Sequence, residues 1–198
     1  MSAEAEQQTR SEVLAKGALA VGSVYGAHAV GPYVRRAFGA SMGGDVEILN
    51  FALTLEYLEA KFYAEAKGRV RADKELMSLI DLLAEDEQQH VDALAATVKQ
   101  LGGKPVMEPK FNFPYSGRSG FLKLAQTLED TGVSAYNGAG PMIKSKEVLA
   151  AAGGIVQVEA RHAATIRLAA GEDPTPDAFD PTMSMDEVLQ AVEPFVQS

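Results

Sequence analysis

The sequence contains no cysteine, and this absence removes several kinds of chemistry at once. A chain without thiols forms no disulfide bond, builds no thiolate metal site and has no cysteine nucleophile. Basic residues are also in the minority, because 18 Lys and Arg stand against 27 Asp and Glu and leave a net charge of −9. Since nucleic acids and anionic membrane surfaces are bound through clustered Lys and Arg, we expect neither as a partner.

Strand signals are absent as well, and apolar residues recur at helical spacing instead. The chain has 198 residues, of which 46% are hydrophobic, so it is long enough for one domain with a sizeable core plus extensions. We therefore predict an all-α protein with a four-helix domain in residues 41–171. Residues 1–40 form an N-terminal extension in this prediction, and residues 172–198 form a C-terminal extension with a short helix.

The N-terminal extension has two interpretations. Residues 14–34 are a small-residue apolar run, but Lys16 and His28 interrupt it and it is too weakly hydrophobic for a spanning helix. It is either a degenerate export signal, which would place the protein in the periplasm or cell envelope, or an extra helix packed on the domain or on a partner chain. The second interpretation is compatible with a cytoplasmic protein. We interpret His28 as structural.

The helical pattern predicts helices over residues 46–67, 74–101, 120–137 and 141–170, and a terminal helix over 185–196. Asp45 and Asp73 are the expected N-caps of the first two helices. The connection between the second and third helices has about 17 residues and can span about 55 Å, whereas a 20-residue helix is about 30 Å long. The sequence thus predicts two antiparallel hairpins joined by a long crossover, which Phe111, Phe113 and Tyr115 would fix in place.

A carboxylate and an imidazole fall together on the apolar face of the second helix. Glu87 and His90 are three residues apart, which puts them on one side of a helix. Apolar residues flank Glu87 at −7, −4, −3, +4 and +7: Ile80, Leu83, Ala84, Val91 and Leu94. Burying both groups costs several kcal/mol unless they are compensated, and one divalent metal ion would compensate both.

The same arrangement occurs a second time. Glu159 and His162 have the same spacing within an equivalent apolar frame on the fourth predicted helix. Glu56 lies 31 residues before Glu87 and Glu129 lies 30 residues before Glu159, each within a similar frame. Each of these two Glu residues is followed seven positions later by a tyrosine, Tyr63 or Tyr136. The chain therefore reads as a twofold repeat of a Glu/Tyr helix and a Glu-x-x-His helix.

This combination resembles the ferritin-like superfamily, in which two helices each supply one Glu and two others each supply a Glu-x-x-His. Residues 50–59, 121–136 and 158–162 are closer still to bacterial ferritin-like domain proteins related to plant desiccation-related proteins. The resemblance covers residues 45–170. Many such relatives carry a twin-arginine export signal, from which Arg10-Ser11 departs.

The resemblance implies a dinuclear metal site. By analogy the ligands are Glu56, Glu87, His90, Glu129, Glu159 and His162. Four carboxylates and two neutral imidazoles carry a charge of −4, which two divalent ions cancel. Two Glu would bridge the ions and two would be terminal. This ligand set suits Fe or Mn, so the expected activity is that of a ferroxidase or oxidase acting on O2, or that of a manganese catalase acting on hydrogen peroxide.

Four further residues and two other functions stay open at this stage. Glu59 is a rival to Glu56 as a ligand, and Asp86 is a candidate to orient a metal-binding His. Tyr63 and Tyr136 either take part in catalysis, by hydrogen bonding to bridging groups or by donating electrons, or belong to the core. The alternative functions are a protective, desiccation-related bundle with a structural metal, and a metal-free helical interaction module. Assembly into a homo-oligomer is not decided by the sequence.

Overall fold

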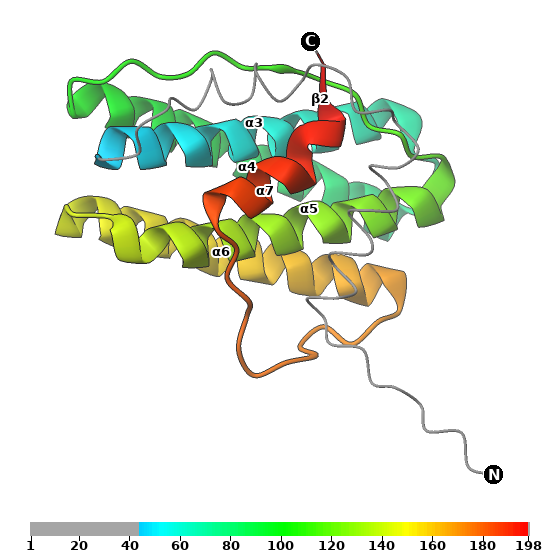
Figure 1. The fold of residues 1–198 in the computed structure, drawn as a ribbon. Helices are drawn as coiled ribbons and strands as arrows, with labels where there is room; N and C mark the ends of the chain where they lie inside the picture. The colour runs from blue at the N-terminus through cyan, green and yellow to red at the C-terminus, as the bar shows by residue number, and fades with distance from the viewer. Residues whose placement is uncertain (1–43, 198) are drawn as a thin grey trace.

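The computed structural model describes residues 44–197 and contains one helical bundle (Figure 1). The predicted all-α, ferritin-like bundle is confirmed. The predictions for residues 1–40, including His28, lie outside the described residues. The elements, in chain order, are α3 (Asp45–Arg69), α4 (Lys74–Gln100), β1 (Lys110–Phe111), α5 (Gly117–Ala139), the 3-10 turn η1 (Gly140–Met142), α6 (Lys146–Ala170), α7 (Met185–Val192), the 3-10 turn η2 (Glu193–Phe195) and β2 (Val196–Gln197).

The bundle consists of two antiparallel hairpins, α3–α4 and α5–α6, joined by the long crossover (Figure 1). The crossover runs along the length of the bundle, so α5 starts at the same end as α4 and runs parallel to it. Its aromatic residues hold it in place as predicted, because Phe111 and Phe113 are buried and the Phe113 ring lies 5.2 Å from that of Phe62 on α3.

One of the two predicted N-caps is correct and the other is wrong. Asp73 caps α4 by accepting a hydrogen bond from the Leu76 backbone N–H. Asp45 is already the first residue of α3, and Gly44 occupies the capping position before it. The Asp45 carboxylate instead accepts hydrogen bonds from the backbone N–H groups of Lys144 and Ser145, at 2.8 and 2.7 Å. It therefore ties the start of the first hairpin to the start of α6.

The structure of the C-terminal segment, residues 184–197, was predicted only in part from the sequence. A capping box of Ser184 and Glu187 opens α7, but this helix stops at Val192, before the predicted end at residue 196. The residues after it form η2 and the short strand β2, which pairs antiparallel with β1 in the crossover. This ladder was not predicted, because two residues on each strand leave no alternating pattern. A Cβ on Gly138 of α5 would lie 2.0 Å from the Met183 carbonyl oxygen, so this close approach requires glycine.

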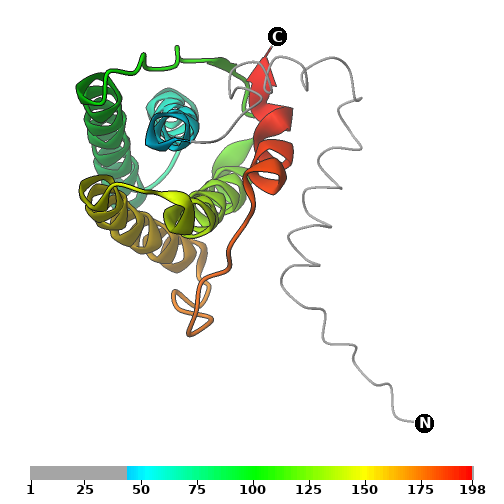
Figure 2. The ribbon, with the colours of Figure 1, turned by 60° about the vertical axis from the view of Figure 1, so that its left-hand side comes forward.

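The crossover and the C-terminal segment enclose the bundle unevenly. Figure 2 shows α3 surrounded by the other bundle helices, α7 and the crossover. Thirteen of the 25 residues of α3 are buried, compared with eight of the 27 residues of α4. The two helices that carry the single Glu residues, α3 and α5, are therefore the more deeply buried pair. No helix within residues 44–197 is long and apolar enough to cross a membrane.

Two apolar clusters fill the two ends of the core. One contains the crossover and α7 together with Phe62, whose ring stacks on Phe121 at 5.2 Å. The other is built mainly from aliphatic residues such as Leu53, Leu94 and Val98. Charged side chains from all four bundle helices are buried between these clusters.

Candidate metal centre

Five carboxyl and two imidazole side chains are buried at the middle of the bundle. The five carboxyl groups are at most 2% exposed, and the two imidazoles are 8% and 4% exposed. All six predicted metal ligands belong to this set, which consists of Glu56, Glu59, Glu87, His90, Glu129, Glu159 and His162. Each of the four bundle helices contributes at least one of them. The spacing of the sequence motifs thus brings the predicted ligands to one level of the bundle.

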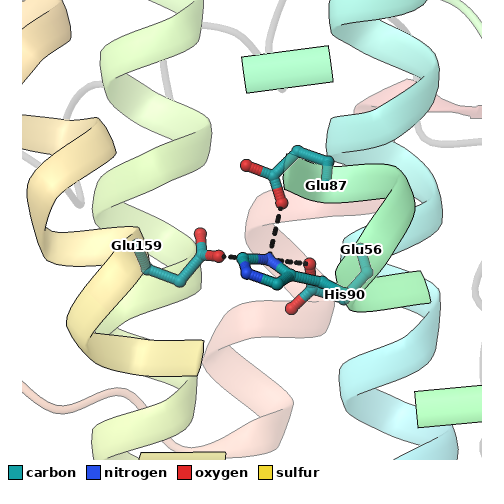
Figure 3. Close-up of side chains that lie close together, drawn as sticks. All are labelled: Glu56, Glu87, His90 and Glu159. Carbon is teal, nitrogen blue, oxygen red and sulfur yellow. Dashed lines mark hydrogen bonds and ion pairs between the residues drawn. The ribbon is translucent and has the colours of Figure 1, made fainter. Parts of the chain in front are cut away.

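The first potential metal position lies around His90. Ligand atoms of Glu56, Glu87, His90 and Glu159 all lie within 4.8 Å of one another. The Nδ1 atom of His90 is 3.2 Å from a Glu56 oxygen, 3.1 Å from a Glu87 oxygen and 2.9 Å from a Glu159 oxygen (Figure 3). Helices α3, α4 and α6 therefore converge on one nitrogen atom.

The second potential position lies around His162. Here Glu87, Glu129, Glu159 and His162 offer ligand atoms within 4.8 Å of one another. The Nδ1 atom of His162 is 2.7 Å from a Glu87 oxygen and 3.7 Å from a Glu129 oxygen. Glu87 and Glu159 belong to both groups, whereas each remaining Glu and each His belongs to one. A pair of ligand groups that share two carboxylates is compatible with a dinuclear metal site.

Without a metal ion, the cluster retains protons. Burial raises the pKa of Glu87 and of Glu159 to about 8, with neighbouring carboxylates adding to the effect. Burial and the same neighbours raise the pKa of Glu129 well above its usual range. Burial alone would lower the pKa of His90, but hydrogen bonds to Glu159, Glu56 and Glu87 raise it to about 12. Metal ions would have to displace these protons.

Several buried polar atoms of this cluster make no well-aligned hydrogen bond within residues 44–197, although Oε1 of Glu87 and Oε1 of Glu159 each lie within ion-pair distance of a histidine nitrogen. They are Oε2 of Glu59, Oε1 of Glu87, Oε2 of Glu129, both carboxylate oxygens of Glu159 and Nδ1 of His162. Each unsatisfied buried group costs about 1–3 kcal/mol. A pair of cations would compensate the unsatisfied atoms of Glu87, Glu129, Glu159 and His162, which belong to the two ligand groups. The cluster is therefore compatible with a dinuclear metal site on the chemistry of its donors.

A family model described as the ferritin-like domain matches residues 44–172. The chain belongs to the ferritin-like domain family. A solved structure of ferritin-like, diiron-carboxylate proteins from Bacillus anthracis strain Ames is 22% identical, with a TM-score of 0.59, and the match covers 63% of this chain and 94% of that one. A conserved hypothetical protein from Mycobacterium tuberculosis is 14% identical, with a TM-score of 0.59 and coverage of 66% and 99%.

At these identities the two solved structures show the fold that this ferritin-like chain adopts. No curated protein matches the chain. The predicted membership of the ferritin-like superfamily is confirmed. The narrower resemblance to desiccation-related proteins stays a prediction.

In this ferritin-like bundle, Asp86 orients one histidine. The Oδ2 atom of Asp86 on α4 lies 3.2 Å from Nε2 of His162 on α6. An Nε2–H that donates to this carboxylate leaves the lone pair on Nδ1, the atom that faces Glu87 and Glu129. The position equivalent to Asp86 in the other hairpin is Val158, which has no acceptor on its side chain. Asp86 thus makes the contact that the predicted orienting role requires.

The two tyrosines exchange hydrogen bonds between the hairpins. Tyr63 of α3 donates its hydroxyl hydrogen to Glu129 of α5, and Tyr136 of α5 donates to Glu56 of α3. Glu129 and Glu56 are the carboxylates that the two ligand groups do not share. A catalytic role for the tyrosines stays a prediction. Burial, followed by the charge of the accepting carboxylate, raises the pKa of both tyrosines, so both remain protonated donors.

Glu59 is buried, although the sequence placed it off the centre of the apolar stripe. It is 2% exposed and lies outside both ligand groups. Its carboxylate occupies the space beside Gly132 of α5, where a Cβ would lie 3.0 Å from its Oε1 atom. One sequence signal predicts its burial, since apolar residues lie at −7, −4, +4 and +7 from it: Ala52, Leu55, Tyr63 and Ala66.

Proposed function

We propose that this ferritin-like bundle binds two divalent metal ions, iron or manganese, and acts as an oxidoreductase on O2 or hydrogen peroxide. The observation that carries the proposal is the pair of four-residue ligand groups that share Glu87 and Glu159 and contain one His each. The structural likeness to proteins described as diiron-carboxylate supports the choice of a dinuclear site.

Each ligand has a distinct role in this proposal. Glu87 and Glu159 would bridge the two ions, because their oxygen atoms belong to both groups. Glu56 and His90 would complete the coordination of one ion, and Glu129 and His162 would complete that of the other. The set contains only oxygen and imidazole nitrogen donors, which suits iron and manganese. Its charge of −4 with neutral histidines matches two divalent cations.

The protein's own contribution is to hold these ligands in place and to keep bulk water out. The pair of ions would supply the electrons for reducing O2, or would cycle between oxidation states as hydrogen peroxide is disproportionated. Tyr63 and Tyr136 hold the terminal carboxylates, and Asp86 holds the ring of His162. The carboxylates are 0% exposed, so the site is a low-dielectric one in which electrostatic interactions are strong.

Metal content is the first test. Protein expressed with both Fe and Mn available is analysed by elemental mass spectrometry, and we expect two ions per chain. Glu87→Gln removes one shared carboxylate and should abolish stoichiometric binding. Glu85→Gln is the matched control, because Glu85 is exposed on the same helix two residues away and should keep both ions. Circular dichroism confirms that both variants remain helical.

Activity is assayed with the metal that the protein retains. Fe-loaded protein should consume O2, and Mn-loaded protein should release O2 from hydrogen peroxide. Protein that binds no metal and keeps its melting temperature when Fe or Mn is added would rule out the dinuclear site. Protein that binds two ions without turnover would favour the non-enzymatic protective bundle, in which the metal only holds the fold.

A further inference from the structure

Exposed apolar side chains gather at one end of the bundle, where α3 and α6 begin and α4 and α5 finish (left in Figure 1). Within residues 44–197, seven large hydrophobic side chains are 45% exposed or more, and four of them lie in the connections or the first helical turn at this end. These four, which we call the apolar end, are Leu101, Met107, Met142 and Leu149. A gathered group of this kind marks an interaction site, whereas scattered single residues do not.

The apolar end flanks the start of α3 on two sides. Asp45, the first residue of α3, accepts hydrogen bonds from two backbone N–H groups in the turn between Met142 and Leu149. Asn50, further along α3, accepts one at 2.8 Å from the crossover backbone just before Met107. Figure 2 shows the crossover on one side of α3 and the α5–α6 turn on the other. The segment before α3 therefore joins the bundle in the middle of this apolar surface.

A small apolar pocket of about 20 Å³ lies at the same end. Ile48 of α3, Ala139 of α5 and Ile143 after η1 form part of its wall. A volume of this size has room for a group about as large as a water molecule or a methyl group. Because the wall is almost entirely apolar, it favours a methyl group over water. The surface thus offers a place for the tip of one apolar side chain.

The chain itself supplies an apolar segment next to this surface. Residues 14–34 contain a single formally charged side chain, that of Lys16. Leaving apolar surface in water costs about 25 cal/mol per Å² compared with burying it. Gly44 follows ten residues after Val34, a length of chain that spans at most about 35 Å. The run is therefore tied within reach of the apolar end.

We propose that the apolar run of residues 14–34 docks on the apolar end of its own bundle. A short tether gives an effective concentration on the order of millimolar, which favours the run of the same chain over that of a second copy. Of the two interpretations of the N-terminal extension, this inference favours the packed segment over the export signal. It goes beyond the proposed function and does not depend on metal ions.

Contact is tested in the full-length chain with a single spin label. Because the chain has no cysteine, Ser23→Cys introduces the only thiol, within the apolar run. A nitroxide attached there broadens the NMR signals of nearby methyl groups, and the same protein with a diamagnetic analogue of the label is the reference. We expect strong broadening for Met142 and Leu149. Leu82 and Leu168 are the controls, because they are also exposed but lie toward the other end of the bundle.

A mixed sample identifies which chain supplies the docked run. Spin-labelled protein without isotopes is mixed with isotope-labelled protein that carries no spin label. Docking within one chain predicts no broadening at the apolar end in this mixture. Broadening there would overturn the proposal, because the run of a second copy would then be the occupant. Absence of broadening in the singly labelled chain, or equal broadening at both ends of the bundle, would overturn it as well.

Charged substitutions at the apolar end should release the run. Met142→Glu combined with Leu149→Glu places two carboxylates in the proposed contact. Leu82→Glu combined with Leu168→Glu adds the same charge at exposed positions toward the other end and is the matched control. Trypsin cleaves after Lys16, so the rate of this cleavage, followed by mass spectrometry, reports how accessible the run is.

We expect cleavage to be several-fold faster in the apolar-end variant than in the parent protein, and unchanged in the control. Urea unfolding checks that both variants keep the folded bundle. Equal cleavage rates in all three proteins would overturn the docked run and favour the export signal. The dinuclear metal site would be unaffected by that result, because its test is the metal content of the parent protein.

Discussion

The two hairpins carry the same ligands in different surroundings. In each, one helix supplies a single Glu with a tyrosine seven residues later, and the other supplies a Glu-x-x-His. They differ at two positions close to these ligands. Glu59 of the α3–α4 hairpin stands where the α5–α6 hairpin has Gly132, and Asp86 of the first hairpin stands where the second has Val158.

Both differences add a carboxyl group to the α3–α4 hairpin, yet they act across the bundle. Asp86 contacts His162 of the other hairpin, and Glu59 lies beside Gly132 of the other hairpin. The shared ligands Glu87 and Glu159 tie the two metal positions together. The ligand set is therefore close to symmetric between the hairpins, whereas Asp86 and Glu59 make the surroundings of the two potential metal positions unequal.

The largest effect is expected from pH, and it involves both hairpins alike. The folded pKa of Glu87 and of Glu159 is raised from 4.5 to about 8. These two groups then bind protons more tightly in the folded protein than in the unfolded protein, so their contribution to stability is fully present below pH 4.5 and is lost as the pH rises to about 8. The raised pKa of His90 adds a loss in the same direction above its ordinary value of 6.5. Urea unfolding of metal-free protein between pH 5 and 8 measures this loss.

Metal-loaded protein is the control for this pH series. Metal ions need deprotonated carboxylates, so their binding should strengthen over the same pH range and the loaded protein should not lose stability there. Glu87→Gln and Glu159→Gln should each flatten the metal-free profile, and by similar amounts if the hairpins are equivalent in this respect. A metal-free profile that is level from pH 5 to 8 would contradict the raised pKa values.

Removing Asp86 should make the two metal positions visibly unequal. Asp86→Ala frees Nε2 of His162, and the loss of such an orienting partner lowers metal affinity by roughly 10–100-fold. The loss of affinity should affect only the ion at the His162 position. Calorimetric titration with Mn(II) measures the affinities of the two ions separately. Asp92→Ala is the matched control, because Asp92 is an exposed carboxylate on the same helix. Equal weakening of both ions would show that Asp86 acts through its charge on the whole cluster.

Glu59 should reduce the stability of the metal-free protein without binding metal. Glu59→Leu replaces a buried carboxyl, one oxygen of which has no partner, by an apolar group of similar size. We expect an increase of about 1–2 kcal/mol in the free energy of unfolding at pH 7. Glu59→Gln, which keeps a polar group, should give a smaller gain. Elemental analysis should still find two ions, and the loss of one would show that the hairpins differ in their number of ligands.

The burial of the Glu and His cluster was predictable because the pattern that places it is local. A Glu and a His three residues apart in an apolar helical frame must share a face, and the repeat of this pattern placed both pairs in one core. Glu59 was harder to predict, since a helix that packs on one side would expose a residue 60° from the stripe centre. The crossover and the C-terminal segment cover additional faces of α3, so more of its circumference is buried.

Contacts between distant segments left no signal in the sequence. The seven-residue spacing places Tyr63 two turns from Glu56 on the same face of α3, but its acceptor is Glu129 on α5. That choice depends on how the antiparallel helices α3 and α5 are aligned, which their own patterns do not state. The β1–β2 ladder similarly joins residues far apart in the chain through two residues on each side.

The smallest effects are expected from the two tyrosines, and they should differ from each other. Tyr63→Phe leaves Glu129 without a partner for Oε1, and its Oε2 already lacks one. Tyr136→Phe leaves Glu56 with a second oxygen that still contacts His90. In metal-free protein we therefore expect a loss of about 1 kcal/mol or more for Tyr63→Phe and a smaller loss for Tyr136→Phe, measured by urea unfolding. Equal losses would show that Glu56 gains nothing from His90 and that the hairpins are more alike than their hydrogen bonds indicate.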